Sequence, residues 1–168
     1  MRYIFKRRLN QSGVTLIETL LVMGLLSIML VVLATIFTSA ADVQQQSKSY
    51  SSTISSGRFI VARLNYDIAH ASSVIVPSST GVSGANLVIV VNGNNNVYSL
   101  NGNNLQLNDG SGSANLNSDD VTVSNLSFIE LTNAFSKPTI QYSFTLTSIA
   151  KSHGTAVTQT FTSTAGLR

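Results

Sequence analysis

The chain has 168 residues, which suits one globular domain and one further element. It is 43% hydrophobic but only 10% charged, and it holds no cysteine, so disulfides and thiolate metal sites are excluded. The formal charge is +3, but four of the ten bases precede Gly13. The remaining six bases face seven acids, and this net charge of −1 offers no bulk electrostatic attraction for nucleic acid.

The first predicted element is an apolar helix that follows a short basic segment. From Val14 to Phe37 the sequence holds no Lys, Arg or Asp, and Glu18 is the only charged residue. About 24 residues make a helix of roughly 36 Å, which is enough to cross a bilayer core of about 30 Å. The bases before it predict a cytoplasmic N-terminus and an exported C-terminal part. These bases are Arg2, Lys6, Arg7 and Arg8.

Two simpler interpretations of this segment remain open. One is a conventional secretory signal, because Ser39-Ala40-Ala41 resembles a cleavage site made of small residues. The apolar cores of such signals run only about 7–15 residues, and this segment is longer. The other is a plain membrane anchor that keeps its N-terminus. Glu18 argues against both, because a carboxylate inside a membrane segment costs up to roughly 2.5 kcal/mol or more and marks a functional position.

The segment Gly13-Val14-Thr15-Leu16-Ile17-Glu18 resembles the cleavage and methylation motif of type IV prepilins and of the pseudopilins of type II secretion. The first mature residue in that family is most often Phe, and Val stands in its place here. The resemblance implies that a prepilin peptidase cuts between Gly13 and Val14 and that the Val14 amine is N-methylated. It assigns the rest of the recognition motif to Thr15, Leu16 and Ile17.

The resemblance also implies a role for Glu18 in assembly. The carboxylate of an incoming subunit would pair with the Val14 amine of its neighbour and set the register of the fibre. From the residues alone, Glu18 could instead pair within its own helix or favour the helix N-terminus, where an acid is stabilised.

A second, amphipathic half-helix is expected to follow the membrane segment. Its apolar stripe, at spacings of three, four and seven, consists of Val43, Tyr50, Ile54, Val61, Leu64, Ile68, Ala71 and Ile75. Arg63 and Asp67 fall off this stripe, as do the glutamines and Lys48 near its start. Gly57 weakens the helix by roughly 1 kcal/mol relative to Ala and favours a bend or break. Pro77 is expected to end the helical region.

From Ala85 onward the apolar residues recur with a period of two, which predicts about five or six antiparallel strands. The predicted strands are Leu87–Val91, Val97–Leu100, Leu105–Leu107, Val121–Leu131, Ile140–Leu146 and Val157–Phe161. Asn101-Gly102 predicts a hairpin, and a slip in the alternation at Ser124-Asn125 predicts a bulge. One sheet packed on the helix stripe makes a two-layer α+β fold, in agreement with the pilin fold that the resemblance implies.

The predicted domain organisation has four parts. Residues 1–13 form a basic leader peptide that is cleaved, and residues 14–38 form a transmembrane and assembly helix. Residues 39–76 form the amphipathic half-helix. Residues 77–168 form an antiparallel β domain, which packs with that half-helix as one globular head.

The head offers no recognisable catalytic or metal-ligand spacing, so we expect no enzyme activity, no cofactor and no metal. His70 falls in the amphipathic helix and His153 in a loop, and both are expected to have surface or packing roles. The loop that begins at Asp109, or the one that begins at Asn117, could bind calcium through oxygen, but each is better explained as a solvated turn. Asn125-Leu126-Ser127 fits a glycosylation triplet, which is a weak signal. In the two loops considered for calcium, the other residues with candidate oxygen ligands are Ser111 and Ser113 in the first and Asp119 and Asp120 in the second.

The predicted function is that of a structural subunit of a type IV pilus or pseudopilus. The subunit would be held in the cytoplasmic (inner) membrane by a single pass and then assembled into an extracellular or periplasmic fibre. Leu64–Ala71 resembles the Leu-x-x-Asp-Ile-x-x-Ala helix segment of minor pilins and minor pseudopilins, which favours a minor subunit. A type IV pilus, a competence pseudopilus and a type II secretion pseudopilus are not separated by this sequence.

The expected partners follow from that function. They are other pilin or pseudopilin subunits, the prepilin peptidase and methyltransferase, membrane lipid and, indirectly, the assembly platform with its ATPase. The alternative function is a single-pass membrane-anchored or secreted β domain with an adhesive or other binding role. Nucleic acid is not an expected partner of this chain alone.

Overall fold

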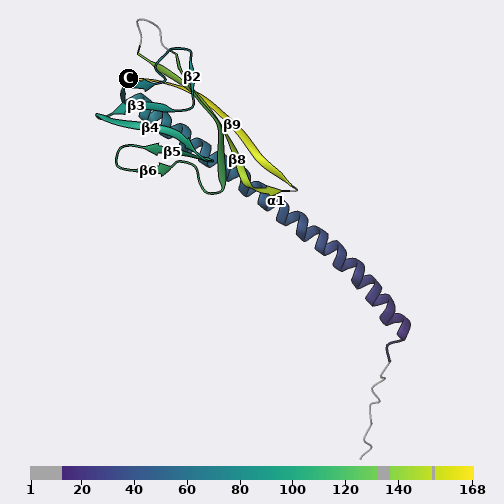
Figure 1. Cartoon of the computed structure of the whole chain (residues 1–168). Helices are drawn as coiled ribbons and strands as arrows, with labels where there is room; N and C mark the ends of the chain where they lie inside the picture. Colours follow the sequence, from purple (N-terminus) through teal and green to yellow (C-terminus); the bar gives the residue numbers. More distant parts are fainter. Residues whose placement is uncertain (1–12, 132–136, 153) are drawn as a thin grey trace, which may run out of the picture. The chain divides into compact units, whose positions relative to one another are not determined.

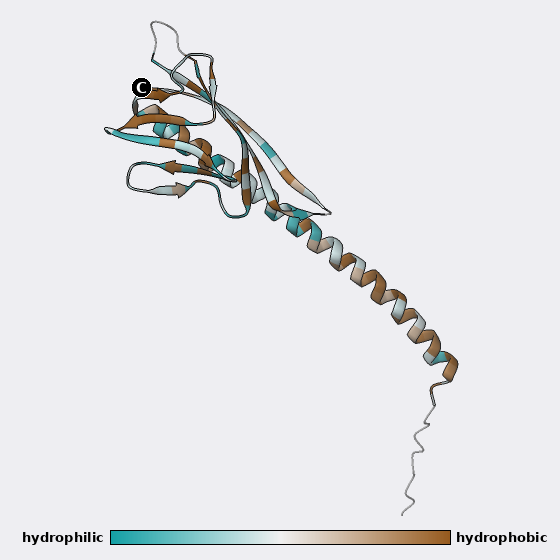
Figure 2. Cartoon of the chain, viewed as in Figure 1, coloured by the Kyte–Doolittle hydropathy of each residue, from teal (hydrophilic) through white to brown (hydrophobic). Residues whose placement is uncertain are grey.

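The computed structural model of the protein describes residues 13–131, 137–152 and 154–168. The chain divides into two compact units, with the boundary between Ala41 and Asp42. One helix, α1 (Leu16–His70), contributes residues to both units. In the first unit every described residue is exposed, and Figure 2 shows this part of the helix coloured mostly as hydrophobic. In the second unit, by contrast, many side chains are buried, because there the chain forms a hydrophobic core.

The second unit contains two antiparallel sheets, and Figure 1 labels most of their strands. The five-stranded sheet has the order β1-β3-β4-β5-β6, and the four-stranded sheet has the order β2-β7-β8-β9. The strands of the first sheet are β1 (Ala71–Val76), β3 (Leu87–Val91), β4 (Asn94–Asn101), β5 (Asn104–Asn108) and β6 (Ser113–Asn115). The strands of the second are β2 (Ser83–Gly84), β7 (Val121–Leu131), β8 (Thr139–Ser152) and β9 (Thr155–Gly166).

The core of the second unit lies between the C-terminal part of α1 and both sheets. Ile60, Leu64 and Ile68 of α1 are fully buried in one cluster with the inward-facing residues of the strands. The largest of these are the aromatic side chains Tyr98, Phe128, Tyr142 and Phe144. The predicted α+β, pilin-like architecture is confirmed, although two sheets take the place of the single predicted sheet.

Local turn signals were reliable guides to strand pairing. Asn101 pairs with Asn104 across a two-residue turn in which Gly102 has a φ of 59°, so the predicted hairpin is confirmed. A second hairpin joins β3 to β4 through Asn92-Gly93, whose φ angles of 52° and 82° match a type I′ turn. The predicted bulge in β7 is also confirmed: the register with β8 shifts between Ser124 and Ser127.

The end of the helix was predicted wrongly. We expected helix up to Pro77, but α1 ends at His70 and the next six residues form β1. Ala71 pairs with Val91 and Val76 pairs with Val88, both in β3. Sheet pairing with a distant strand overrides the local helical period, and β-branched residues near the end of β1 suit the strand conformation.

The N-terminal part of the predicted apolar stripe was also wrong. The buried residues of α1 are Ser49, Thr53, Ser56, Gly57, Ile60, Leu64, Asp67 and Ile68. Leu64 and Ile68 therefore match the stripe, but Val43 and Tyr50 are 66% and 56% exposed. The face that packs on the sheets is rotated away from them.

Small hydroxyl residues explain this rotation. The Thr53 hydroxyl donates to the Ser49 carbonyl at 2.8 Å, and the Ser56 hydroxyl lies 3.1 Å from that of Ser118 in the loop before β7. Small side chains of this kind let backbones approach closely, and the hydroxyls of Thr53 and Ser56 find hydrogen-bond partners there, whereas the buried Ser49 hydroxyl has none among the described residues. A hydrophobic pattern cannot detect a packing face of this kind, because serine and threonine count as polar.

Gly57 provides a close approach, and the helix does not break there, since α1 continues through this position. A Cβ atom added at Gly57 would lie 2.1 Å from Cζ of Phe161 on β9. That ring also stacks on Phe144 with 5.3 Å between ring centroids. The missing side chain is what allows the ring to lie against the helix backbone.

This contact predicts that Gly57→Ala changes the free energy of unfolding in opposite directions with and without the Phe161 ring. Gly57→Ala should lower the free energy of unfolding by about 1–3 kcal/mol, because the new methyl group displaces the Phe161 ring. With Phe161→Ala already in place, the same substitution should stabilise the protein by about 1 kcal/mol through helix propensity. Urea denaturation of the full chain in detergent measures both values. A stabilising effect of Gly57→Ala in the wild-type background would contradict this account of the glycine.

Candidate functional site

The predicted processing residues lie at the start of α1. Gly13 and Val14 precede the helix and are exposed, so the helix begins two residues later than we expected. A Cβ atom at Gly13 would meet nothing within 4 Å. Leu16 and Ile17, in the first turn, are exposed as well. The backbone around the proposed cut is therefore unobstructed by the described part of the chain.

Thr15 caps the helix. The N–H of Glu18 donates to the Thr15 carbonyl at 3.1 Å and lies 3.4 Å from the Thr15 hydroxyl oxygen. The spacing Thr-x-x-Glu is that of a capping box, in which the acid would return a hydrogen bond to the N–H of the cap residue. Within the described residues that return bond is not formed, and the Glu18 carboxylate accepts no hydrogen bond. The acid is thus exposed in the first turn, where the helix dipole favours a negative charge.

The apolar part of α1 satisfies its own polar groups. The hydroxyls of Ser27 and Thr35 donate to backbone carbonyls one turn earlier, at 2.8 and 2.9 Å. The hydroxyls of Thr19 and Thr38 do the same over three residues. The polar groups of a segment in lipid must form their hydrogen bonds within the protein, because the bilayer core contains no water to act as a partner. In the described part of the chain, α1 is long and apolar enough to span a membrane.

Comparison with protein families bears on this same segment. Residues 8–34 match the family model of the prokaryotic N-terminal methylation motif. The chain carries that methylation motif. Comparisons with curated proteins and with solved structures found no match. The methylation motif includes the predicted cut, the predicted methylated residue and Glu18, and it supports the resemblance to type IV pilins and pseudopilins.

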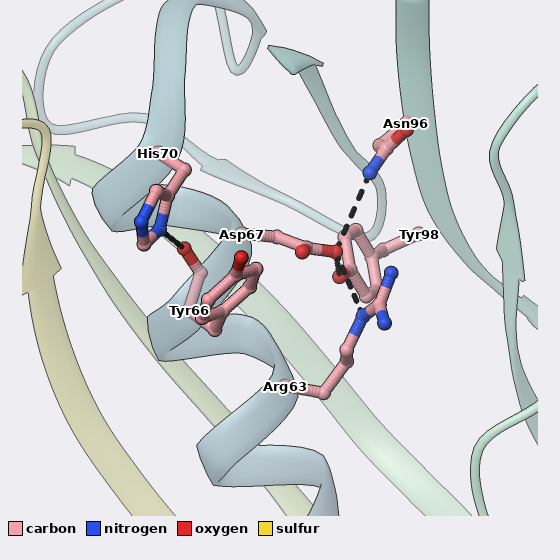
Figure 3. Close-up of polar contacts among 6 residues, drawn as sticks. All are labelled: Arg63, Tyr66, Asp67, His70, Asn96 and Tyr98. Carbon is pink, nitrogen blue, oxygen red and sulfur yellow. Dashed lines mark hydrogen bonds and ion pairs between the residues drawn. The ribbon is translucent and has the colours of Figure 1, made fainter. Parts of the chain in front are cut away.

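A second polar cluster, which our sequence reasoning missed, lies in the second unit (Figure 3). Asp67 of α1 is 1% exposed, and its Oδ2 accepts hydrogen bonds from Arg63 Nε at 3.0 Å and from the Tyr98 hydroxyl. The Asn96 amide donates to the same oxygen at 3.4 Å. Together these contacts join α1 to β4.

One sequence signal could have found this carboxylate. In the segment that resembles Leu-x-x-Asp-Ile-x-x-Ala, the four specified residues Leu64, Asp67, Ile68 and Ala71 are all buried. The intervening positions are exposed or half-buried. The segment therefore specifies a packing face that includes the acid Asp67. A search for apolar residues at helical spacing misses this acid because it counts only hydrophobic side chains.

A second tyrosine ties the same helix to the other sheet. The Tyr142 hydroxyl, on β8, donates to Asn65 Oδ1 at 2.7 Å. Burial raises the pKa of Tyr142 and, more strongly, that of Tyr98, where the hydrogen bond to Asp67 adds to the rise. Both hydroxyls therefore hold their protons in the folded protein above the pH at which an exposed tyrosine ionises.

These pKa values predict a loss of stability in alkali. In the unfolded chain both tyrosines ionise near pH 10 while the folded protein keeps them neutral, so the unfolded state is favoured as the pH rises above about 10. The urea midpoint should fall between about pH 8 and pH 11, and it should fall less in Tyr98→Phe. The exposed Tyr66 supplies the matched control, because Tyr66→Phe should keep the full fall. Equal falls in both variants would show that Tyr98 is not responsible.

The remaining candidates from the sequence are the two histidines, a metal site and the glycosylation triplet. His70 Nδ1 lies 2.8 Å from the Tyr66 carbonyl, and its ring stacks on Tyr66 with 4.2 Å between centroids. His153 lies outside the described residues. Among those described, no group of three or more His, Cys, Asp or Glu side chains is placed to hold a metal. Asn125 is exposed at the bulge of β7, so the glycosylation triplet stays an untested prediction.

The first residue of each loop considered for calcium uses a side-chain oxygen as a hydrogen-bond acceptor within the protein. Asp109 Oδ1 accepts from the Ser111 N–H at 3.0 Å and from the Ser111 hydroxyl at 2.6 Å, and these hydrogen bonds lower the pKa of Asp109. Asn117 Oδ1 accepts from the Leu105 N–H at 2.9 Å, and its amide donates to the Val121 carbonyl at 2.8 Å. The Asp109 contacts are those of a hydrogen-bonded turn, whereas the Asn117 contacts tie its loop to β5 and to the start of β7. Calcium binding by either loop stays an untested prediction.

Proposed function

We propose that the protein is a structural subunit of a type IV pilus or of a related pseudopilus. The observation that carries this proposal is the methylation motif at residues 8–34, at the start of a helix whose apolar residues are exposed on every side. A prepilin peptidase cuts between Gly13 and Val14, and a methyltransferase modifies the new amine. The subunit is held in the inner membrane with its N-terminus in the cytoplasm until it is assembled.

Assembly exchanges lipid for protein around the apolar helix. Apolar side chains such as Leu20, Leu25 and Ile28 are exposed, and in a fibre they would contact the helices of neighbouring subunits. Such contacts are not directional, so they leave the axial position of each subunit undetermined. In our proposal the exposed Glu18 carboxylate pairs with the Val14 amine of a neighbour and sets that position. N-methylation keeps the positive charge of the amine, as methylation of lysine does.

We also propose that the protein is a minor subunit of its fibre, because Leu64–Ala71 resembles a helix segment of minor pilins and minor pseudopilins and its four specified residues are buried. The assembly platform and its ATPase would then act on it together with a more abundant subunit. Quantitative mass spectrometry of purified fibres tests this proposal directly. An abundance well below that of another pilin supports a minor role, and an abundance above all other subunits contradicts it.

The processing step is tested by the mass of the mature protein. Wild-type protein from its native membrane should begin at methylated Val14. Gly13→Val should remain uncleaved, because the processing peptidase is expected to need a small residue before the cut and valine is branched. Gly24→Ala is the matched control, since a Cβ atom there also meets nothing within 4 Å and lies well past the cut. Intact mass and N-terminal sequencing distinguish the products.

The possible starting residues separate the alternatives. A wild-type chain that begins at Met1 would contradict the proposal and favour a permanent membrane anchor. A chain that begins near Ala41 or Asp42 would contradict it as well and indicate a conventionally secreted β domain. Unmethylated Val14 at the N-terminus would support cleavage and remove the methylation step.

A further inference from the structure

The second unit has a polar cavity with a volume of about 320 Å³ above the Asp67 cluster. The C-terminal part of α1 contributes Arg63, Tyr66 and Asp67 to its lining. Ligand cavities in proteins begin at roughly 300 Å³, so this one suits a small ligand. Its base is held rigidly, because the buried Asp67 carboxylate fixes Arg63 from α1 together with Asn96 and Tyr98 from β4 (Figure 3).

Three asparagines also line the cavity. Asn92 belongs to the β3–β4 turn, and Asn94 and Asn96 follow at alternate positions, so both project from the same face of β4. Each amide offers two donors and an acceptor. Asn95, which lies between them, projects from the other face of the strand and is exposed.

The charges of the cavity argue against an ion as its ligand. One guanidinium, from Arg63, faces two carboxylates, from Asp67 and Asp109. Arg63 is already paired with Asp67. The hydrogen bonds from Ser111 lower the pKa of Asp109, so this carboxylate is ionised. An anion would meet this net negative charge. A metal ion would have to displace the Arg63 guanidinium and the Tyr98 hydroxyl from Asp67 Oδ2 to use that oxygen as a ligand. A neutral ligand with many hydroxyl groups has neither cost.

An aromatic side chain completes the cavity. Tyr66 is 58% exposed, yet its ring is held in place by stacking on His70. A preordered aromatic ring beside a row of amides offers both an apolar surface for C–H groups and hydrogen-bond partners for hydroxyls. This combination matches the two kinds of surface that a sugar ring presents.

We propose that this cavity binds a neutral saccharide of one or two rings. Tyr66 contacts the C–H face of a ring, Asn94 and Asn96 exchange hydrogen bonds with its hydroxyls, and Asp109 accepts from another hydroxyl. All its lining residues lie in the second unit, so binding can be measured on the unassembled protein and does not rest on the proposed function. It would make the head a recognition module for neutral glycans.

The test uses the full chain in a detergent without a sugar headgroup, which would otherwise compete. The probes are glucose, galactose and N-acetylglucosamine with the dimers cellobiose, lactose and N,N′-diacetylchitobiose, each at about 10 mM, and binding is read by saturation-transfer NMR. We expect at least one probe to bind with a Kd of about 1 mM. Tyr66→Leu and Asn94→Ala should each weaken that binding at least about fivefold, whereas Asn95→Ala should not change it.

Charged sugars provide a second discriminating comparison. Glucosamine and glucuronic acid should bind more weakly than the neutral sugar of the same ring size. The proposal is overturned if no neutral probe binds, if only a charged sugar binds, or if neither Tyr66→Leu nor Asn94→Ala affects binding. Circular dichroism of each variant establishes that the head remains folded, because both substituted side chains are exposed.

Discussion

Replacing Asp67 by alanine is expected to lower the free energy of unfolding by about 3 kcal/mol. The Tyr98 hydroxyl and the Asn96 amide are buried and would lose their acceptor, and each buried group left unpaired costs about 1–3 kcal/mol. The loss of the ion pair with Arg63 adds little to this cost, because the Arg63 side chain is 40% exposed and water can replace the carboxylate as its partner. Urea denaturation of the full chain, followed by circular dichroism, measures the effect.

Arg63→Ala separates the ion pair from the buried hydrogen bonds. It removes the guanidinium but leaves Tyr98 and Asn96 on the carboxylate. We therefore expect a cost below that of Asp67→Ala but above that of a fully exposed ion pair, because the carboxylate left behind is buried and charged. Asp67→Asn should fall between the two, because its amide oxygen can still accept from the tyrosine hydroxyl. If Arg63→Ala proves as costly as Asp67→Ala, the ion pair and not the Tyr98 contact is the main anchor of α1 on β4.

Removing the charge of Glu18 is expected to reduce incorporation into fibres at least about tenfold, without preventing cleavage after Gly13. An unpaired Val14 amine at the helix–helix interface costs free energy in an apolar setting, and a tenfold effect corresponds to about 1.4 kcal/mol. Fibres sheared from cells that express Glu18→Ala, compared with the processed subunit left in the membrane, give both quantities in one experiment.

Glu18→Gln distinguishes a role that needs the charge of this residue, such as pairing with the neighbouring amine, from helix capping by hydrogen bonds. Glutamine can complete a capping box with Thr15 as well as glutamate can, but it carries no charge. If charge pairing with the neighbouring amine sets the register, Glu18→Gln should be as defective as Glu18→Ala. Normal incorporation of Glu18→Gln beside a defective Glu18→Ala would assign the residue to helix capping. Normal incorporation of both would remove it from assembly.

The sequence by itself determined the features that depend on neighbouring residues. The methylation motif is a run of adjacent residues, and the apolar segment from Val14 is visible in composition alone. The hairpin at Asn101-Gly102 and the bulge near Asn125 were predicted because the backbone angles of a turn depend on the few residues within it. The same holds for the alternation along β8, where the buried residues follow the period of two.

Only the tertiary structure decided the features that depend on distant partners. β1 is a strand because β3 lies beside it, and Gly57 is needed because Phe161 packs against it from a strand about a hundred residues later. Asp67 is buried because Tyr98 and Asn96 meet its carboxylate. Periodicity measures how polar each face of a segment is, and it contains no information on which polar group will find a partner inside the fold. The physical reason is that hydrogen bonding and close packing between distant residues change the cost of burial, so an acid, a glycine or a serine can lie where the pattern alone predicts an apolar side chain.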